Sequence, residues 1–161
     1  MKNYEEIKGD LIELALKGDF DVIAHGCNCF CIMSAGIAPQ MVKHFGCDNF
    51  DMELNETISL KKLGNIDFQH TVVGNESKNL YVVNAYTQFY PGQNSPGCNQ
   101  PLDYEALTLC LRKMNLVFKD MHIGLPQIGC GLAGGDWNEV KKIIQKELIN
   151  CNVTIVIYGR K

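Results

Sequence analysis

The stretch AHGCNCFCIMSAGIA (residues 24–38) contains three cysteines at alternate positions, Cys27, Cys29 and Cys31. The first of them comes two residues after His25. Thiols and an imidazole could hold a metal ion, form a redox centre or line a ligand-binding loop. Zinc sites use C-x₂₋₄-C pairs together with a second pair elsewhere, and a redox centre uses C-x-x-C. The C-x-C-x-C spacing fits neither pattern. It favours a crowded loop of small side chains and predicts no metal site.

Two apolar strands run directly into glycine-rich loops that precede helices. Residues 22–25 lead into GCNCFCIMSAG and a helix from Ile37, and residues 123–127 lead into IGCGLAGG and a helix from Trp137. Ligands of open α/β sheets bind beyond the carboxyl ends of the strands, where helix N-termini offer N–H groups to phosphate. Tight turns alone could also explain the glycines. Two matching loops nevertheless predict a diphosphate site, although neither contains GK[ST] or G-x-G-x-x-G.

The remaining pattern predicts the elements that would position these loops. Further strands are expected around 5–8, 66–73, 80–90 and 152–158, and a further helix around 103–118. The helix from Trp137 is expected to end near 148, and residues 47–64 are expected to be helix and loop. The strands around 66–73 and 80–90 form a predicted hairpin, because Gly, Asn and Ser separate them. This order predicts one three-layer α/β/α domain over residues 1–161. Its central sheet is mixed, mostly parallel and about six strands wide.

Three residues indicate where the helices begin. Pro39 fits a first helical turn, where its missing N–H costs nothing. Asp103 and Asp136 are predicted N-caps, and Glu139, three residues after Asp136, completes the pattern of a capping box. Either aspartate could instead orient a water molecule at the site.

Composition excludes several classes of protein. The chain has 161 residues, 46% of them hydrophobic, and a net charge of −3. Its lysines are scattered, which argues against an extended nucleic-acid surface. The start of the chain carries no apolar signal-peptide segment, and no apolar run approaches the roughly 18 residues of a membrane span. We therefore expect a cytoplasmic protein without membrane partners, monomeric, whose cysteines are thiols.

Four motifs together resemble the macrodomain family, which binds ADP-ribose. They are KGDL (8–11), HGCNCFCIMSAGIA (25–38), VVNAYTQ (82–88) and LPQIGCGLAGGDW (125–137). The resemblance is greatest to the branch of yeast-type ADP-ribose-1''-phosphate phosphatases and similar bacterial and phage proteins. It implies a small-molecule nucleotide ligand, ADP-ribose or its 1''-phosphate, with ADP-ribosylated macromolecules as further partners, and no cofactor.

The resemblance also assigns residue roles. Asp10, between Gly9 and Leu11, matches the acidic residue that accepts a hydrogen bond from the adenine amino group. His25 and Asn28 are the predicted catalytic residues: His25 matches a histidine proposed as catalytic, and Asn28 an asparagine facing the distal ribose. The other predicted ligand-binding residues lie in two loops and one strand end: Met33, Ser34, Ala35, Gly36, Ile37, Ala38, Gln127, Ile128, Gly129, Cys130, Gly131, Leu132, Ala133, Gly134, Asn84, Tyr86 and Gln88.

Two positions depart from the family pattern. Ser34 stands where the family often has glycine, and Ala133 stands where the branch that removes ADP-ribose from glutamate carries an aspartate. The alternatives to a phosphatase are a hydrolase that removes ADP-ribose from protein, nucleic acid or small acyl groups, and a non-catalytic ADP-ribose reader. Phe89 and Tyr90 could stack on the adenine or lie on the sheet.

Overall fold

The computed structural model describes residues 3–49, 58–75, 77–92 and 100–159, and their strands form one six-stranded sheet. The strand order is β1-β6-β5-β2-β4-β3. Every neighbouring pair is parallel except β3 and β4, which form the predicted hairpin at one edge. The strands are β1 (Asn3–Gly9), β2 (Val22–Asn28), β3 (Ile66–Val73), β4 (Lys78–Gln88), β5 (His122–Leu125) and β6 (Asn152–Tyr158).

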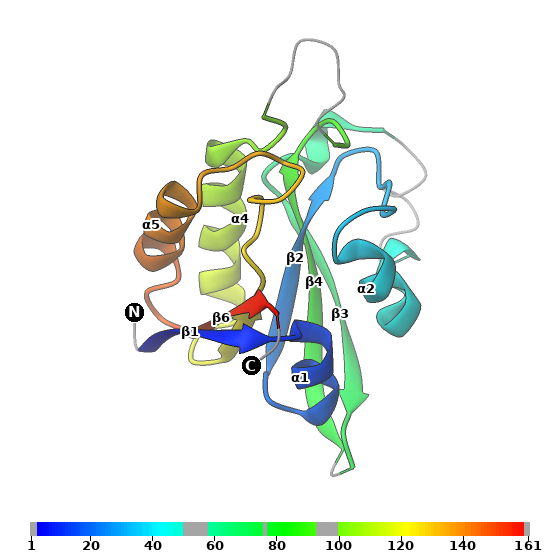
Figure 1. Cartoon of the computed structure of the whole chain (residues 1–161), viewed down its shortest axis with the longest axis vertical. Coiled ribbons are helices and arrows are strands. Elements are labelled where there is room, and N and C mark those ends of the chain that lie inside the picture. The colour runs from blue at the N-terminus through cyan, green and yellow to red at the C-terminus, as the bar shows by residue number, and fades with distance from the viewer. Residues whose placement is uncertain (1–2, 50–57, 76, 93–99, 160–161) are drawn as a thin grey trace.

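Helices cover both faces of this sheet (Figure 1). Helices α4 (Tyr104–Val117) and α5 (Trp137–Glu147) pack on one face, and α1 (Leu11–Lys17) and α2 (Ala38–Phe45) pack on the other. Each face has its own apolar core, so the sheet is the buried middle layer. The predicted three-layer fold with a mixed, mostly parallel sheet is therefore confirmed.

The end of β2 differs from the sequence-based expectation. We predicted a buried strand within FDVIAHGC (20–27), with the glycine-rich loop beginning directly after His25. In the structure β2 continues to Asn28, since β4 pairs with it from His25↔Asn84 to Asn28↔Gln88 with a register shift between Cys27 and Asn28. His25 therefore lies within the sheet and not at its edge.

Aspartate side chains cap three of the helices. Asp10 accepts from Ile12 N and Glu13 N at the start of α1, and Asp103 and Asp136 cap α4 and α5 as predicted. Pro39 lies in the first turn of α2, also as predicted.

The capping box expected at α5 does not form. The backbone N–H of Asp136 donates to the Tyr104 hydroxyl at 2.9 Å, and Glu139 instead pairs with Lys142 at 3.6 Å. The Tyr104 hydroxyl from α4 thus accepts the hydrogen bond that we predicted for the Glu139 side chain.

The described residues between α2 and β3 form no long helix or strand. They contain two short 3-10 helices, Cys47–Asn49 and Leu60–Lys62. The expectation of helix and loop over 47–64 falls partly on residues 50–57, which lie outside the described residues. No helix in the described part of the chain is long and apolar enough to cross a bilayer.

Candidate functional site

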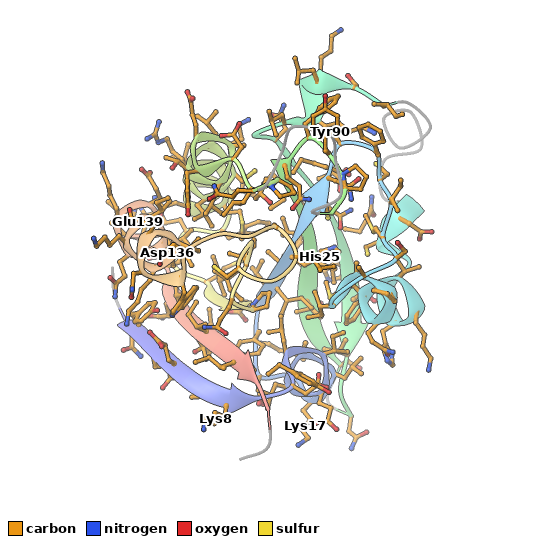
Figure 2. All side chains as sticks on the ribbon, turned by 45° about the horizontal axis from the view of Figure 1, so that its top comes forward. Lys8, Lys17, His25, Tyr90, Asp136 and Glu139 are labelled. Atoms are coloured by element: carbon orange, nitrogen blue, oxygen red, sulfur yellow. The ribbon has the colours of Figure 1, made fainter. Side chains whose placement is uncertain are left out.

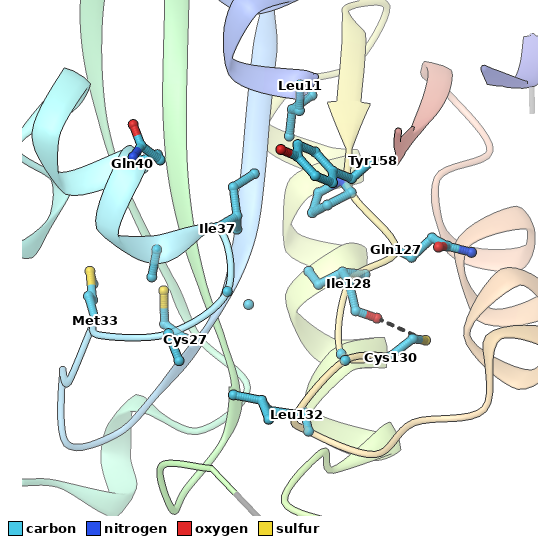
Figure 3. A pocket seen from close by; sticks show the side chains of 18 of the residues that line it. Leu11, Cys27, Met33, Ile37, Gln40, Gln127, Ile128, Cys130, Leu132 and Tyr158 are labelled. Atoms are coloured by element: carbon cyan, nitrogen blue, oxygen red, sulfur yellow. Dashed lines mark hydrogen bonds between the residues drawn. The ribbon is translucent and has the colours of Figure 1, made fainter. Parts of the chain in front are cut away.

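A cavity of about 1180 Å³ opens at the carboxyl ends of the parallel strands. The end of β2 reaches its floor, while the loops after β2 and β5 lie on opposite sides (Figure 3). Ligands of open α/β sheets bind at such an edge. The predicted site residues that line the cavity are Asp10, Leu11, Asn28, Met33, Ser34, Ala35, Gly36, Ile37, Ala38, Gln88, Gln127, Ile128, Gly129, Cys130, Gly131, Leu132 and Ala133.

The first loop, residues 29–37, takes its shape from the side chain of Asn28. The Asn28 Oδ1 atom accepts from Phe30 N at 3.0 Å and from Ile32 N at 3.2 Å, and Nδ2 donates to Ile32 O at 2.8 Å. These three bonds hold a turn that contains Cys31 at φ +56°. Asn28 thus shapes the loop while also lining the cavity.

The second loop, residues 126–135, depends on glycine. Gly129 has φ +74°, and a Cβ there would lie 2.7 Å from a methyl group of Leu102. The carbonyl of Gly129 accepts from Gly135 N at 2.8 Å, which closes the loop on itself. Gly131 has no atom within 4 Å of its Cβ position, so a side chain there would meet open space.

Backbone N–H groups are the polar feature that both loops share. Within the described residues, no hydrogen bond uses the N–H groups of residues 34–37 or 131–133. Residues 34–37 directly precede α2, whose N-terminus carries a partial positive charge. Runs of unpaired N–H groups beside a helix start favour an anion.

Asp10 lies where β1 ends and α1 begins, at the rim of the cavity. Its Oδ1 atom accepts from Ile12 N at 3.0 Å and from Glu13 N at 3.1 Å. The same carboxylate therefore caps the helix and offers a second oxygen. The structure brings Asp10 to the same cavity as both loops.

His25 lies inside the molecule (Figure 2) and is fully buried. Its Nε2 atom lies 2.7 Å from Asn84 Oδ1 and 3.4 Å from Cys27 Sγ. Asn84 Nδ2 donates to Asp67 Oδ1 and to Cys47 O, so Asn84 Oδ1 is the acceptor for His25. The proton of the neutral imidazole is therefore assigned to Nε2.

Burial lowers the pKa of His25 to about 4, against a smaller opposing effect of Asn84. His25 also does not line the cavity. The imidazole is therefore part of the buried hydrogen-bond network around Asn84. The proton-transfer role of His25 stays a prediction.

Four other predicted residues do not line the cavity: Gly9, Asn84, Tyr86 and Gly134. Asn84 and Tyr86 are buried instead, and both donate to the carboxylate of Asp67. The Tyr86 hydroxyl lies 2.6 Å from Asp67 Oδ2. Burial and that carboxylate raise the pKa of Tyr86. The side chains of VVNAYTQ therefore divide between a buried network and the site.

Several lining residues were not among the predicted ligand-binding residues. They are Ile12, Glu13, Leu16, Gly26, Cys27, Ile32, Gln40, His44, Pro91, Gly92, Pro126, Val156 and Tyr158. Tyr158 pairs with Gly9 in the parallel β1–β6 ladder, so the strand-end rule applied to the last strand could have found it. In Figure 3 Tyr158 lies beside Leu11.

Three lining residues, Asp10, Glu13 and His44, have side chains suited to acid–base chemistry. The described lining includes no Lys or Arg. Burial raises the pKa of the Cys27 thiol and brings that of Cys130 to about 11, so both are neutral thiols near pH 7. No group of three or more His, Cys, Asp or Glu among the described residues could hold a metal ion. The two loops contribute backbone amides and small side chains, and the acid–base side chains of the lining come from helices α1 and α2 and the end of β1.

No family model matches the chain. It is 31% identical over 158 residues to an uncharacterized 17.5 kDa protein from the tk-vs intergenic region of Enterobacteria phage T4, covering 93% of each. It superposes on a protein of unknown function from Bacteroides thetaiotaomicron with a TM-score of 0.74 and 29% identity, covering 96% of this chain and 98% of that one. It also superposes on a mutant macrodomain of Oceanobacillus iheyensis, solved with ADPR (ADP-ribose), with a TM-score of 0.62 and 19% identity, covering 96% of this chain and 84% of that one.

Proposed function

This chain belongs to the family of the phage T4 protein and has the macrodomain fold, and from that premise we propose that its cavity binds ADP-ribose. The diphosphate lies between the two glycine loops, and the adenine lies beside Asp10. The Oceanobacillus macrodomain, solved with ADPR, supports the choice of ligand. Asp10 accepts a hydrogen bond from the adenine amino group with the oxygen that does not cap α1.

The observation that carries the proposal is the pair of loops that line one cavity and whose N–H groups at 34–37 and 131–133 enter no hydrogen bond among the described residues. A diphosphate is an anion, and the described lining offers it no Lys or Arg. Its charge is therefore met by amide dipoles and the start of α2. The small residues Ala35 and Gly36 in the first loop and Gly131 in the second let the backbone approach the phosphate oxygens closely.

Titration calorimetry with ADP-ribose tests this proposal. We expect the wild-type chain to bind ADP-ribose and to bind ADP more weakly, because ADP lacks the distal ribose. Gly131→Val should abolish binding while leaving thermal unfolding unchanged, since its side chain enters open space. Gly131→Ala is the matched smaller substitution and should weaken binding less. A wild-type chain that fails to bind ADP-ribose would falsify the proposal.

We propose turnover of ADP-ribose-1''-phosphate as a second function of the same cavity. The observation that favours it is the run of unused N–H groups at residues 34–37 and 131–133. Water would attack the phosphate, and the phosphate–oxygen bond would break to give ADP-ribose and inorganic phosphate. Amide dipoles would stabilise the charge that develops on the phosphoryl oxygens.

A turnover panel separates this activity from its alternatives. The panel presents ADP-ribose-1''-phosphate, ADP-ribosylated protein and ADP-ribosylated nucleic acid to the wild type and to His25→Ala. Phosphate release from the first substrate supports the phosphatase, and release of ADP-ribose from the others supports the hydrolase. Binding without turnover of any substrate would identify a reader. A proton-transfer role for His25 requires a large loss of turnover in His25→Ala without a matching loss of binding.

A further inference from the structure

Lys62 is a buried lysine whose side chain reaches the first loop of the cavity. The residue is 1% exposed, and its Nζ atom donates to Cys31 Sγ at 3.1 Å. Lysine is almost never fully buried unless its ammonium group is paired, because removing that charge from water is unfavourable. A buried ammonium held against the sulfur of a ligand loop therefore calls for a physical reason.

The backbone around Lys62 is bonded to the central sheet. The carbonyl of Lys62 accepts from Asn65 N at 2.8 Å. Gly64 N donates to Tyr86 O at 2.9 Å, and Tyr86 N donates to Asn65 O at 3.0 Å. Because Tyr86 belongs to β4, the Lys62 side chain reaches the loop from a segment that the sheet holds in place.

Cys31 lies at the sharpest point of the first loop. Its φ of +56° is in the left-handed region, which residues other than glycine adopt at a cost in energy. The next two residues, Ile32 and Met33, line the cavity, and the N–H groups of residues 34–37 follow. The conformation at Cys31 therefore determines the direction in which the chain enters the phosphate-binding part of the loop.

We propose that Lys62 is a positioning residue for the ligand. Its bond to Cys31 holds the first loop in the conformation that presents the N–H groups of residues 34–37 to a diphosphate. The inference rests on the proposed function, because it concerns the same cavity. Lys62 does not line that cavity and acts through the loop. A loop that leaves its binding conformation part of the time lowers the apparent affinity by the fraction that remains competent.

Calorimetry with ADP-ribose and with adenosine tests the contact in four variants. Lys62→Met keeps the length of the side chain without its ammonium group, and Cys31→Ala removes the acceptor. Each should weaken ADP-ribose binding by about three- to tenfold, the value of one hydrogen bond. The double variant Lys62→Met/Cys31→Ala should lose no more than the weaker-binding single variant, because both changes break one contact. Cys31→Ser keeps an acceptor and should keep most of the affinity.

Two controls separate positioning of the loop from a general effect on the fold. Adenosine lacks the diphosphate, so its affinity should be the same in the wild type and in all four variants. Lys113 on α4 provides the second control, because its Nζ atom donates to Gly64 O at 2.9 Å, in the segment that carries Lys62. Lys113→Met should lower the midpoint of urea unfolding and leave the affinity for ADP-ribose unchanged.

Each other outcome overturns the inference. Equal ADP-ribose affinity of Lys62→Met and wild type rejects it while leaving the proposed function intact. Additive losses in the double variant, or Cys31→Ser binding as weakly as Cys31→Ala, show that the hydrogen bond between the two side chains does not hold the loop. A parallel loss of adenosine affinity, or an equal loss of ADP-ribose affinity in Lys113→Met, assigns the effect to the fold. A wild-type chain that does not bind ADP-ribose rejects the inference together with the proposed function.

Discussion

His25 illustrates how one residue type can have two interpretations in a sequence. An imidazole next to a glycine loop has the chemistry of a proton-transfer group. In the fold it is a neutral, fully buried side chain whose Nε2–H points to Asn84. The sequence could not show this, because Asn84 reaches His25, and Asp67 reaches Asn84, only through the pairing of β2, β4 and β3.

The lowered pKa of His25 makes stability depend on pH. The folded pKa is about 4 and the ordinary value is 6.5, so the unfolded chain binds more protons between these two values. Stability is therefore full above pH 6.5 and falls as the pH drops toward 4. The complete effect is on the order of 3 kcal/mol.

Urea unfolding between pH 7 and pH 4 measures this dependence. His25→Gln should flatten the fall in stability across that window, whatever its own stability at pH 7. The exposed His70, hydrogen-bonded to Asn79 at 2.9 Å, provides the control His70→Gln, which should keep the wild-type slope. Parallel curves for wild type and His25→Gln would show that another group causes the fall.

Asp10 has two roles in our account, and two substitutions separate them. Asp10→Asn retains an oxygen for Ile12 N and Glu13 N, so helix α1 keeps its cap. The side-chain NH₂ of the asparagine would then face the adenine amino group, and both groups are hydrogen-bond donors. We therefore expect Asp10→Asn to lose affinity for ADP-ribose while its free energy of unfolding stays unchanged. Asp10→Ala should lose the affinity and also about 1 kcal/mol of unfolding free energy. Retained affinity in Asp10→Asn, measured by calorimetry, would contradict the adenine contact.

At the scale of elements, short sequence patterns correctly predicted the helices and strands that turn residues and hydrophobic periodicity determine. The β3–β4 hairpin, helix α4 with its Asp103 cap and the apolar β6 are confirmed, because turn residues and periodicity encode each of them. The extension of β2 to Asn28 was missed. Gly-Cys-Asn has no strand signal of its own and becomes strand only through β4.

The start of α5 at Trp137 with its Asp136 cap is confirmed, but the partner of the Asp136 N–H was missed for a similar reason. The Tyr104 hydroxyl comes from α4 and meets Asp136 N only after both helices pack on one face of the sheet. Tyr104→Phe should lower the unfolding free energy by about 1 kcal/mol. Glu139→Ala should change it by less than about 0.5 kcal/mol, because Glu139 does not complete a capping box. Urea denaturation of both variants measures these changes in unfolding free energy. A larger effect for Glu139→Ala than for Tyr104→Phe would show that Glu139 does complete a capping box.

At the scale of the molecule, the site follows from the topology. Parallel strands β1, β6, β5, β2 and β4 end at one edge, so loops distant in sequence meet at one cavity. The sequence predicted both glycine loops and their place at strand ends. The sequence could not predict which side chains of VVNAYTQ face the cavity. A register shift between β2 and β4 interrupts the strand alternation there, and a single sequence does not show such a shift.

The same arrangement determines how binding responds to salt. The chain carries a net charge of −3, and the described lining has no Lys or Arg for the diphosphate. Salt weakens attraction between exposed opposite charges, whereas bonds from backbone amides to phosphate involve no mobile cation. We expect the affinity for ADP-ribose to change by less than about threefold between low and high salt, about 0.05 to 0.5 M.

Calorimetry in sodium chloride at both concentrations measures this response. ADP-ribose and unphosphorylated adenosine should show nearly the same small salt effect, because neither meets a lysine or arginine in the described site. A steep loss of ADP-ribose affinity with salt, absent for adenosine, would place a cationic side chain against the diphosphate. That result would contradict recognition by backbone N–H groups alone.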